Sequence, residues 1–198
     1  LSRILYPEVN ALQYAFLGPL VGALARAAAG KPSDRIGGGR ITFWVFIAMS
    51  LGVLGVLYAI GDTGNSLSFP IFFASFLFLF AMTGIGNAST FQMIPAIMRK
   101  EVARLEPQLA PADRVKEADR EAAAIIGFTS AIAAYGAFFI PKSFGSAISM
   151  TGGAEPALYG FLAFYMSCIA VTWWFYTRRG GLLHDVERGG QASTIPTQ

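Results

Sequence analysis

Five apolar blocks dominate this 198-residue sequence, and each is about as long as a bilayer is thick. They cover approximately residues 10–30, 41–61, 69–98, 121–148 and 156–177. A transmembrane helix needs roughly 20 predominantly apolar residues. Charged residues make up 14% of the chain, whereas a soluble domain carries about 25%. The sequence therefore predicts an all-α membrane protein with five transmembrane helices and no internal water-soluble domain.

Basic residues gather in alternate connections between the apolar blocks. They cluster in 31–40, in 99–120 and again in 178–188, whereas the connections 61–68 and 150–155 contain no lysine or arginine. Short loops that are rich in lysine and arginine remain in the cytoplasm. We therefore expect the C-terminus and both basic loops to be cytoplasmic. This distribution explains the net charge of +3 as a topology signal and argues against a nucleic-acid partner.

Three parts are predicted along the chain. Residues 1–9 are expected to form an extracytoplasmic loop or the end of a missing helix, and residues 10–178 the transmembrane helical bundle. Residues 179–198 are polar and glycine-rich, which predicts a disordered cytoplasmic tail. His184 lies in this tail and is expected to be solvated. Cys168, the single cysteine, lies in the last apolar block, so no intrachain disulfide is expected.

The apolar blocks differ in character, which predicts the surfaces that meet lipid. Block 41–61 is almost wholly apolar and is expected to face lipid. In the third block, the stretch GIGNASTFQ (84–92) is rich in small and polar residues, so we expect it to face protein or a water-filled path. Block 121–148 carries a face of small residues, and Pro141 is expected to break this helix near its outer end. The charged stretch 99–120 is expected to be a solvated linker with a short surface helix.

One arginine, Arg26, lies inside the first apolar block, in the stretch LGPLVGALARAAAG. A charged side chain at the centre of a transmembrane helix costs about 2.5–3.5 kcal/mol on insertion scales. One explanation is that the long side chain reaches the membrane interface, because the helix ends near Gly30 or Ser33. The other is that the planar guanidinium binds a small oxyanion. The residues alone leave both explanations open, and the polar stretch 84–92 favours a central solute path.

No aspartate, glutamate or histidine lies in the middle of any apolar block. Proton-coupled carriers commonly place a titratable group inside the membrane, so the pattern favours facilitated exchange over proton symport. The sequence also lacks a nucleophile–base pair, a metal-ligand cluster and a phosphate-binding loop. We therefore predict that the chain is not an enzyme and that it binds no cofactor and no metal.

Three stretches carry a resemblance to a known family. They are residues 17–40, which contain Arg26 and SDRIGG, GIGNASTFQMIPAI (84–97) and GFTSAIAAYGAFFIPKSFGS (127–146). Together they resemble the nitrate/nitrite porters (NarK type) of the major facilitator superfamily, in particular helices eight to twelve of their C-terminal half. The resemblance implies two six-helix bundles around a central pore and alternating access. It also implies transport or exchange of nitrate and nitrite across a bacterial inner membrane.

The same resemblance implies roles for particular residues. Arg26 aligns with the arginine that the C-terminal half contributes to an anion clamp, and Gly127 and Ser130 fall where the family's signature helix approaches the substrate. Asn87 is a further candidate ligand, with interhelical hydrogen bonding as the alternative role. Asp34 and Arg35 are the expected gating-turn residues on the cytoplasmic side. The family's usual pattern there, RPxGGxLSDR, is replaced by RAAAGKPSDR, which puts the gating turn in doubt more than the arginine.

The resemblance covers one half of such a transporter. An N-terminal six-helix bundle and helix seven are expected to be missing, so the chain should not transport alone. Its expected partners are this second bundle, the lipid bilayer, and nitrate and nitrite anions. Two rival hypotheses are a carrier for another small or organic anion or a sugar, and a non-transporting or truncated membrane subunit. A larger solute requires more hydrogen-bonding residues in the helices, and a non-transporting subunit would show no dependence on Arg26.

Overall fold

The computed structural model describes residues 14–62 and 66–178, and these residues form long helices. The elements are α3 (Leu17–Ile36), α4 (Gly38–Gly61), α5 (Ser68–Leu105), α6 (Pro111–Thr151), α7 (Glu155–Thr172) and the π-helical turn η1 (Trp173–Thr177). Each of the five predicted helices is present, and no strand occurs within the described ranges. Residues 1–9 and the tail 179–198, with His184, lie outside these ranges.

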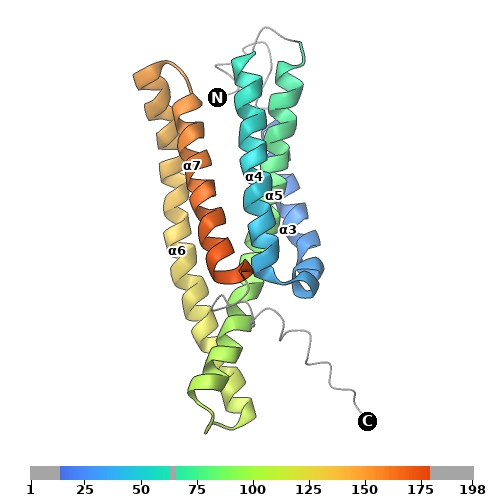
Figure 1. Cartoon of the computed structure of the whole chain (residues 1–198), viewed down its shortest axis with the longest axis vertical. Helices are drawn as coiled ribbons and strands as arrows, with labels where there is room; N and C mark the ends of the chain where they lie inside the picture. The colour runs from blue at the N-terminus through green and yellow to red at the C-terminus, as the bar shows by residue number, and fades with distance from the viewer. Residues whose placement is uncertain (1–13, 63–65, 179–198) are drawn as a thin grey trace.

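Among the described residues, four helical segments are long and apolar enough to cross a membrane. They are Gly38–Gly61, Ser68–Leu105, Pro111–Thr151 and Glu155–Thr177, and α3 contributes the shorter apolar stretch Leu17–Gly30. The predicted fold class, an all-α membrane protein, is therefore confirmed. The junction of α3 with α4, the α5–α6 loop and the end of η1 lie at one end of the bundle (Figure 1). The end of α4, the start of α5 and the connection after α6 lie at the other end, as the alternating charge pattern predicts.

Helix α3 continues beyond the point at which the apolar sequence ends. Its backbone is helical through Pro32 and up to Ile36, so the helix ends later than Gly30 or Ser33. The helix is interrupted at Gly37, whose φ of 98° lies in the region that glycine adopts without steric cost. The expected gating residues Asp34 and Arg35 therefore belong to the helical backbone, and their side chains lie outside the described part of the structure.

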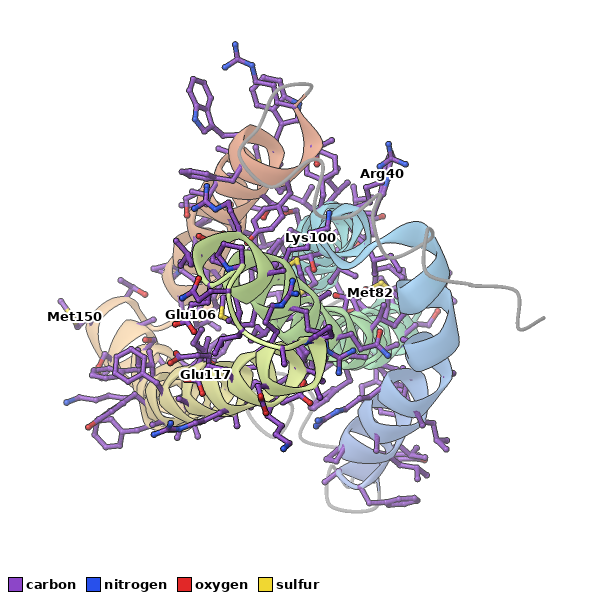
Figure 2. All side chains as sticks on the ribbon, turned by 90° about the horizontal axis from the view of Figure 1, so that it is seen from below. Arg40, Met82, Lys100, Glu106, Glu117 and Met150 are labelled. Carbon is purple, nitrogen blue, oxygen red and sulfur yellow. The ribbon has the colours of Figure 1, made fainter. Side chains whose placement is uncertain are left out.

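The stretch 99–120, expected to be a solvated linker with a short surface helix, forms the tip of a helical hairpin. Helix α5 continues to Leu105 and α6 begins at Pro111. Proline suits a first helical turn, because the N–H that it lacks would have no partner within the helix there. Val102, Ala118 and Ala122 are buried between the two helices. The hairpin projects beyond the other helices (Figure 1), and its charged side chains surround the tip when the bundle is viewed from below, where Lys100, Glu106 and Glu117 are labelled (Figure 2). The charge in this stretch therefore reflects two solvated helix ends.

An ion pair joins the two helices of this hairpin near its base. Arg99 Nη2 lies 3.1 Å from Asp119 Oδ1, and Arg99 Nε donates to the same oxygen at 3.3 Å. Both side chains are more than half exposed, and exposed ion pairs contribute about 0–1 kcal/mol. The buried small residues therefore contribute more to closing the hairpin than the ion pair does.

The expected break at Pro141 is wrong. Helix α6 runs through Pro141 to Thr151, and α5 likewise contains Pro95 in its interior. Proline is tolerated within membrane helices because neighbouring groups satisfy the backbone that it frees. Helix α6 ends instead at Gly152, which adopts a left-handed conformation with φ 80°.

Helix α4 forms the centre of the described bundle. It packs against α5 and α7, and its residues Val53, Val56, Ala59 and Ile60 form a buried cluster with Phe72 of α5 and Leu158 of α7. The expectation that 41–61 faces lipid is therefore wrong for this buried side, and it stays a prediction for the other side, where Trp44, Leu51 and Tyr58 are exposed. Because the whole segment is apolar, its sequence carries no signal that separates these two sides.

Helices α3 and α5 approach each other closely through glycines. A Cβ atom added at Gly84 would overlap the backbone carbonyl of Gly22 and would lie 3.1 Å from the backbone nitrogen of Arg26. A Cβ at Gly18 would lie 2.5 Å from the ring of Phe80. Small residues allow this kind of backbone contact between membrane helices. The contact fixes the position of α3, and with it Arg26, relative to α5.

We expect Gly84→Ala to destabilise the folded chain by about 1–3 kcal/mol, because the new methyl group forces α3 away from α5. The matched control is Gly160→Ala on α7, where an added Cβ has no neighbour within 4 Å. Thermal unfolding in detergent measures both variants. Equal melting temperatures for the two variants would contradict the close backbone contact.

Candidate functional site

Arg26 lies on α3 one turn beyond the glycine contact, and its side chain is exposed. The guanidinium carbon Cζ lies 5.3 Å from the ring centroid of Phe91 on α5. A cation over an aromatic face gains about 0.5–1 kcal/mol at exposed sites and more when it is desolvated. Among the described residues the guanidinium donates no hydrogen bond, so its N–H donors remain available to a ligand.

Gln92, the next residue on α5, joins the same two helices. Its Nε2 donates a hydrogen bond of 3.1 Å to the backbone carbonyl of Gly30. Gly30 lies four residues after Arg26, so both face α5 from the same side of α3. The Oε1 of Gln92 is buried and has no hydrogen-bond partner among the described residues. The polar stretch of α5 therefore contacts α3 directly beside the arginine.

The rest of this polar stretch divides into a buried and an exposed face. Ser89 is fully buried, and its hydroxyl forms a 2.9 Å hydrogen bond with Thr42 of α4. Thr83, Asn87 and Thr90 are exposed. Interhelical hydrogen bonds in this region thus come from Ser89 and Gln92, and the role of Asn87 as a ligand stays a prediction.

The two candidates on α6, Gly127 and Ser130, are exposed on another part of the bundle. Helix α6 packs against α5 and α7, whereas α3 packs against α5 and α4. Viewed from below, α3 and α6 lie on opposite sides of α5 (Figure 2). A Cβ added at Gly127 would meet nothing within 4 Å. The structure does not bring these residues up to Arg26, and their proposed roles stay predictions.

Sequence reasoning placed Gln92 in a polar stretch but assigned it no role, and it did not single out Phe91. A signal for Phe91 was present, since it lies four residues after Asn87 and seven after Gly84, on the same face of a helix. The hydrogen bond from Gln92 to Gly30 had no such signal, because it depends on how α3 and α5 pack against each other. Within residues 14–62 and 66–178, no cluster of histidine, cysteine, aspartate or glutamate is arranged to hold a metal ion.

The sequence of the chain is similar to those of known proteins. No protein-family profile matches the chain. Over 181 residues it is 42% identical to the nitrate/nitrite transporter NarU of Salmonella typhimurium and 41% identical to that of Escherichia coli. The chain is a homologue of the nitrate/nitrite porters. It is also 37% identical over 169 residues to the probable nitrate/nitrite antiporter NarK2 of Thermus thermophilus, and the resemblance seen in the sequence is confirmed.

The alignments cover most of this chain but less than half of each relative. They include 90% of this chain but 39% of each NarU protein, and 85% of this chain but 34% of NarK2. The chain therefore spans about two fifths of the length of the NarU proteins that it matches. The relatives carry transporter or antiporter names, which supports the prediction that this homologue of the porters is not an enzyme.

The exposed side of the polar stretch can be tested with single cysteines in a Cys168→Ala background. We expect a membrane-impermeant, charged thiol reagent to label Asn87→Cys, because a polar position is costly against lipid and should face water. It should spare Ser89→Cys, which is fully buried, and Leu51→Cys, which lies on the apolar exposed face of α4. Labelling of Leu51→Cys as fast as Asn87→Cys would show that Asn87 has no special access to water.

Proposed function

We propose that this chain is part of a carrier that moves nitrate and nitrite across the bacterial inner membrane. The similarity to proteins named nitrate/nitrite transporters supports the substrate, and the arginine held against Phe91 carries the structural argument. A guanidinium remains charged at every physiological pH and presents a planar fork of donors, which suits a small planar oxyanion. Its charge is only partly screened inside a membrane, so the attraction to an anion is stronger there than in water.

Arg26 is the anion-binding group of this chain in the proposal. Asn87 supplies a neutral amide on the neighbouring helix α5, and Gly127 and Ser130 line the path of the anion along α6, at a point away from Arg26. Gly127 suits close approach because the space beside it is open and no Cβ intervenes. No covalent step is required, since transport needs only that the loaded site opens to each side in turn.

The proposed orientation places the C-terminus and the basic connections in the cytoplasm. The ends of α3 and η1 lie at the same end of the bundle, and the α5–α6 hairpin projects beyond them in the same direction (Figure 1), which fits the positive-inside pattern. Asp34 and Arg35 lie at this end, within the last turn of α3, and we assign them to the cytoplasmic gate. The spans carry no carboxylate in their middle, which favours exchange of nitrate for nitrite over proton symport.

A further helical bundle completes the carrier in this proposal. Aromatic and aliphatic side chains on the membrane part of α6, including Phe128, Ile132 and Tyr135, are exposed. The NarU proteins are more than twice as long as the stretch that this chain matches. The additional helices would supply the groups that bind the anion opposite Arg26 and would cover the open side of α6.

The test uses a chimera in which this chain replaces the matching stretch of Escherichia coli NarU. Nitrate uptake is measured in liposomes that contain nitrite, for the chimera and for its Arg26→Lys variant. We expect the lysine variant to lose at least about tenfold in kcat/KM, or roughly 1.4 kcal/mol, because lysine keeps the charge but lacks the planar fork.

The matched control is Arg104→Lys, at an exposed position on the hairpin tip, which should transport like the unmodified chimera. Equal uptake by the Arg26→Lys and Arg104→Lys variants would mean that Arg26 only reaches the membrane interface. An unmodified chimera that inserts normally but takes up no nitrate would contradict the proposed function itself.

A further inference from the structure

Gln92 makes a contact that the proposed transport function does not explain. It donates from α5 to the carbonyl of Gly30 on α3 across 62 positions of sequence, at 3.1 Å. A backbone carbonyl inside a helix already accepts the bond of its own helix, so this acceptor has no need of a second donor. An amide is also an expensive group to place between two apolar helices, and its Oε1 is buried without a partner. If this position only had to fill space between the helices, an apolar residue of the same size would do so at a lower cost in free energy.

The contact joins the two turns in which proline weakens the helices. Pro32 lies within α3 and has no N–H to donate to the carbonyl of Ala28. Pro95 lies within α5 and has none to donate to the carbonyl of Phe91. Gly30 lies between the first pair and Gln92 between the second. The hydrogen bond therefore ties together two segments that bend more easily than the rest of their helices.

The arginine lies directly before the weakened turn of α3. Arg26 lies one turn before Gly30, and the ring beneath its guanidinium belongs to Phe91, the neighbour of Gln92. If the two weakened turns moved independently, the guanidinium would shift relative to the ring by more than an anion site tolerates. A single bond between Gly30 and Gln92 is placed where it prevents this movement.

We propose that Gln92 is a positioning residue, which ties the proline-weakened turns of α3 and α5 together and so keeps Arg26 seated on Phe91 for anion binding. The inference rests on the proposed function of Arg26. It assigns to Gln92 no contact with the anion. Its effect should therefore appear in the affinity for nitrate and should disappear once the arginine fork is gone.

The test measures nitrate uptake by the NarU chimera with Gln92→Met and Gln92→Leu, which fill a similar space but lose the N–H donor. We expect the KM for nitrate to rise about three- to tenfold, the effect of losing one hydrogen bond that orders the site. We expect kcat to change by less than twofold. In an Arg26→Lys background, adding Gln92→Met should raise the KM by less than twofold, because the two residues act as one unit.

Thr42→Val is the matched control, since it removes the interhelical hydrogen bond between α4 and Ser89 instead. It should leave the KM unchanged while it lowers the melting temperature about as much as Gln92→Met does. An unchanged KM in both Gln92 variants would overturn the inference, as would equal KM increases with and without the Arg26 fork. Failure of both Gln92 variants to insert, with Thr42→Val inserting normally, would show a folding role and would also overturn it. Absence of uptake by the unmodified chimera would instead refute the proposed function.

Discussion

The close approach of α3 to α5 determines the geometry of everything that this chain offers to a solute. The backbones meet at Gly22 and Gly84, where even one methyl group would overlap a carbonyl. Lipid tails are as apolar as the helix surfaces, so membrane helices gain little from burying apolar area and depend on such intimate packing. One to two turns further on, the same interface brings Phe91 under Arg26 and Gln92 against Gly30. The glycine contact, the ring of Phe91 and the amide of Gln92 thus follow one another along the interface between α3 and α5.

The cost of placing an arginine in an apolar helix explains why an aromatic ring of α5 contacts it. A guanidinium exposed to lipid would be pulled toward water, and a long side chain has the freedom to follow. The ring of Phe91 opposes this pull by attracting the cation without neutralising its charge. A carboxylate in the same place would have stabilised the arginine more strongly, but it would also have removed the positive charge that an anion needs. An aromatic partner therefore keeps the group both held and available.

Sequence reasoning reached the fold class because hydrophobic block length is a direct consequence of bilayer thickness. It also singled out Arg26 as the residue that requires an explanation. It failed at Pro141, which it treated as a helix breaker, and it ended the third predicted helix and began the fourth short of the charged stretch 99–120. In the structure α6 runs through Pro141, and the charged stretch forms solvated ends of α5 and α6. Helix ends in a membrane protein depend on where water begins as well as on local propensity. The buried side of α4 and the hydrogen bond from Gln92 to Gly30 could not be predicted from the sequence, because both depend on which helices are neighbours.

The central claim is that Arg26, seated on α5, binds the anion. Nitrate-dependent thermal stabilisation of the purified NarU chimera tests it most directly, because a ligand that binds only the folded state raises the melting temperature. The account predicts that millimolar nitrate stabilises the unmodified chimera, that sulfate at equal ionic strength does not, and that Arg26→Gln abolishes the nitrate effect while the protein still melts cooperatively. Equal stabilisation of Arg26→Gln by nitrate would contradict the account, because the anion would then be bound without the arginine.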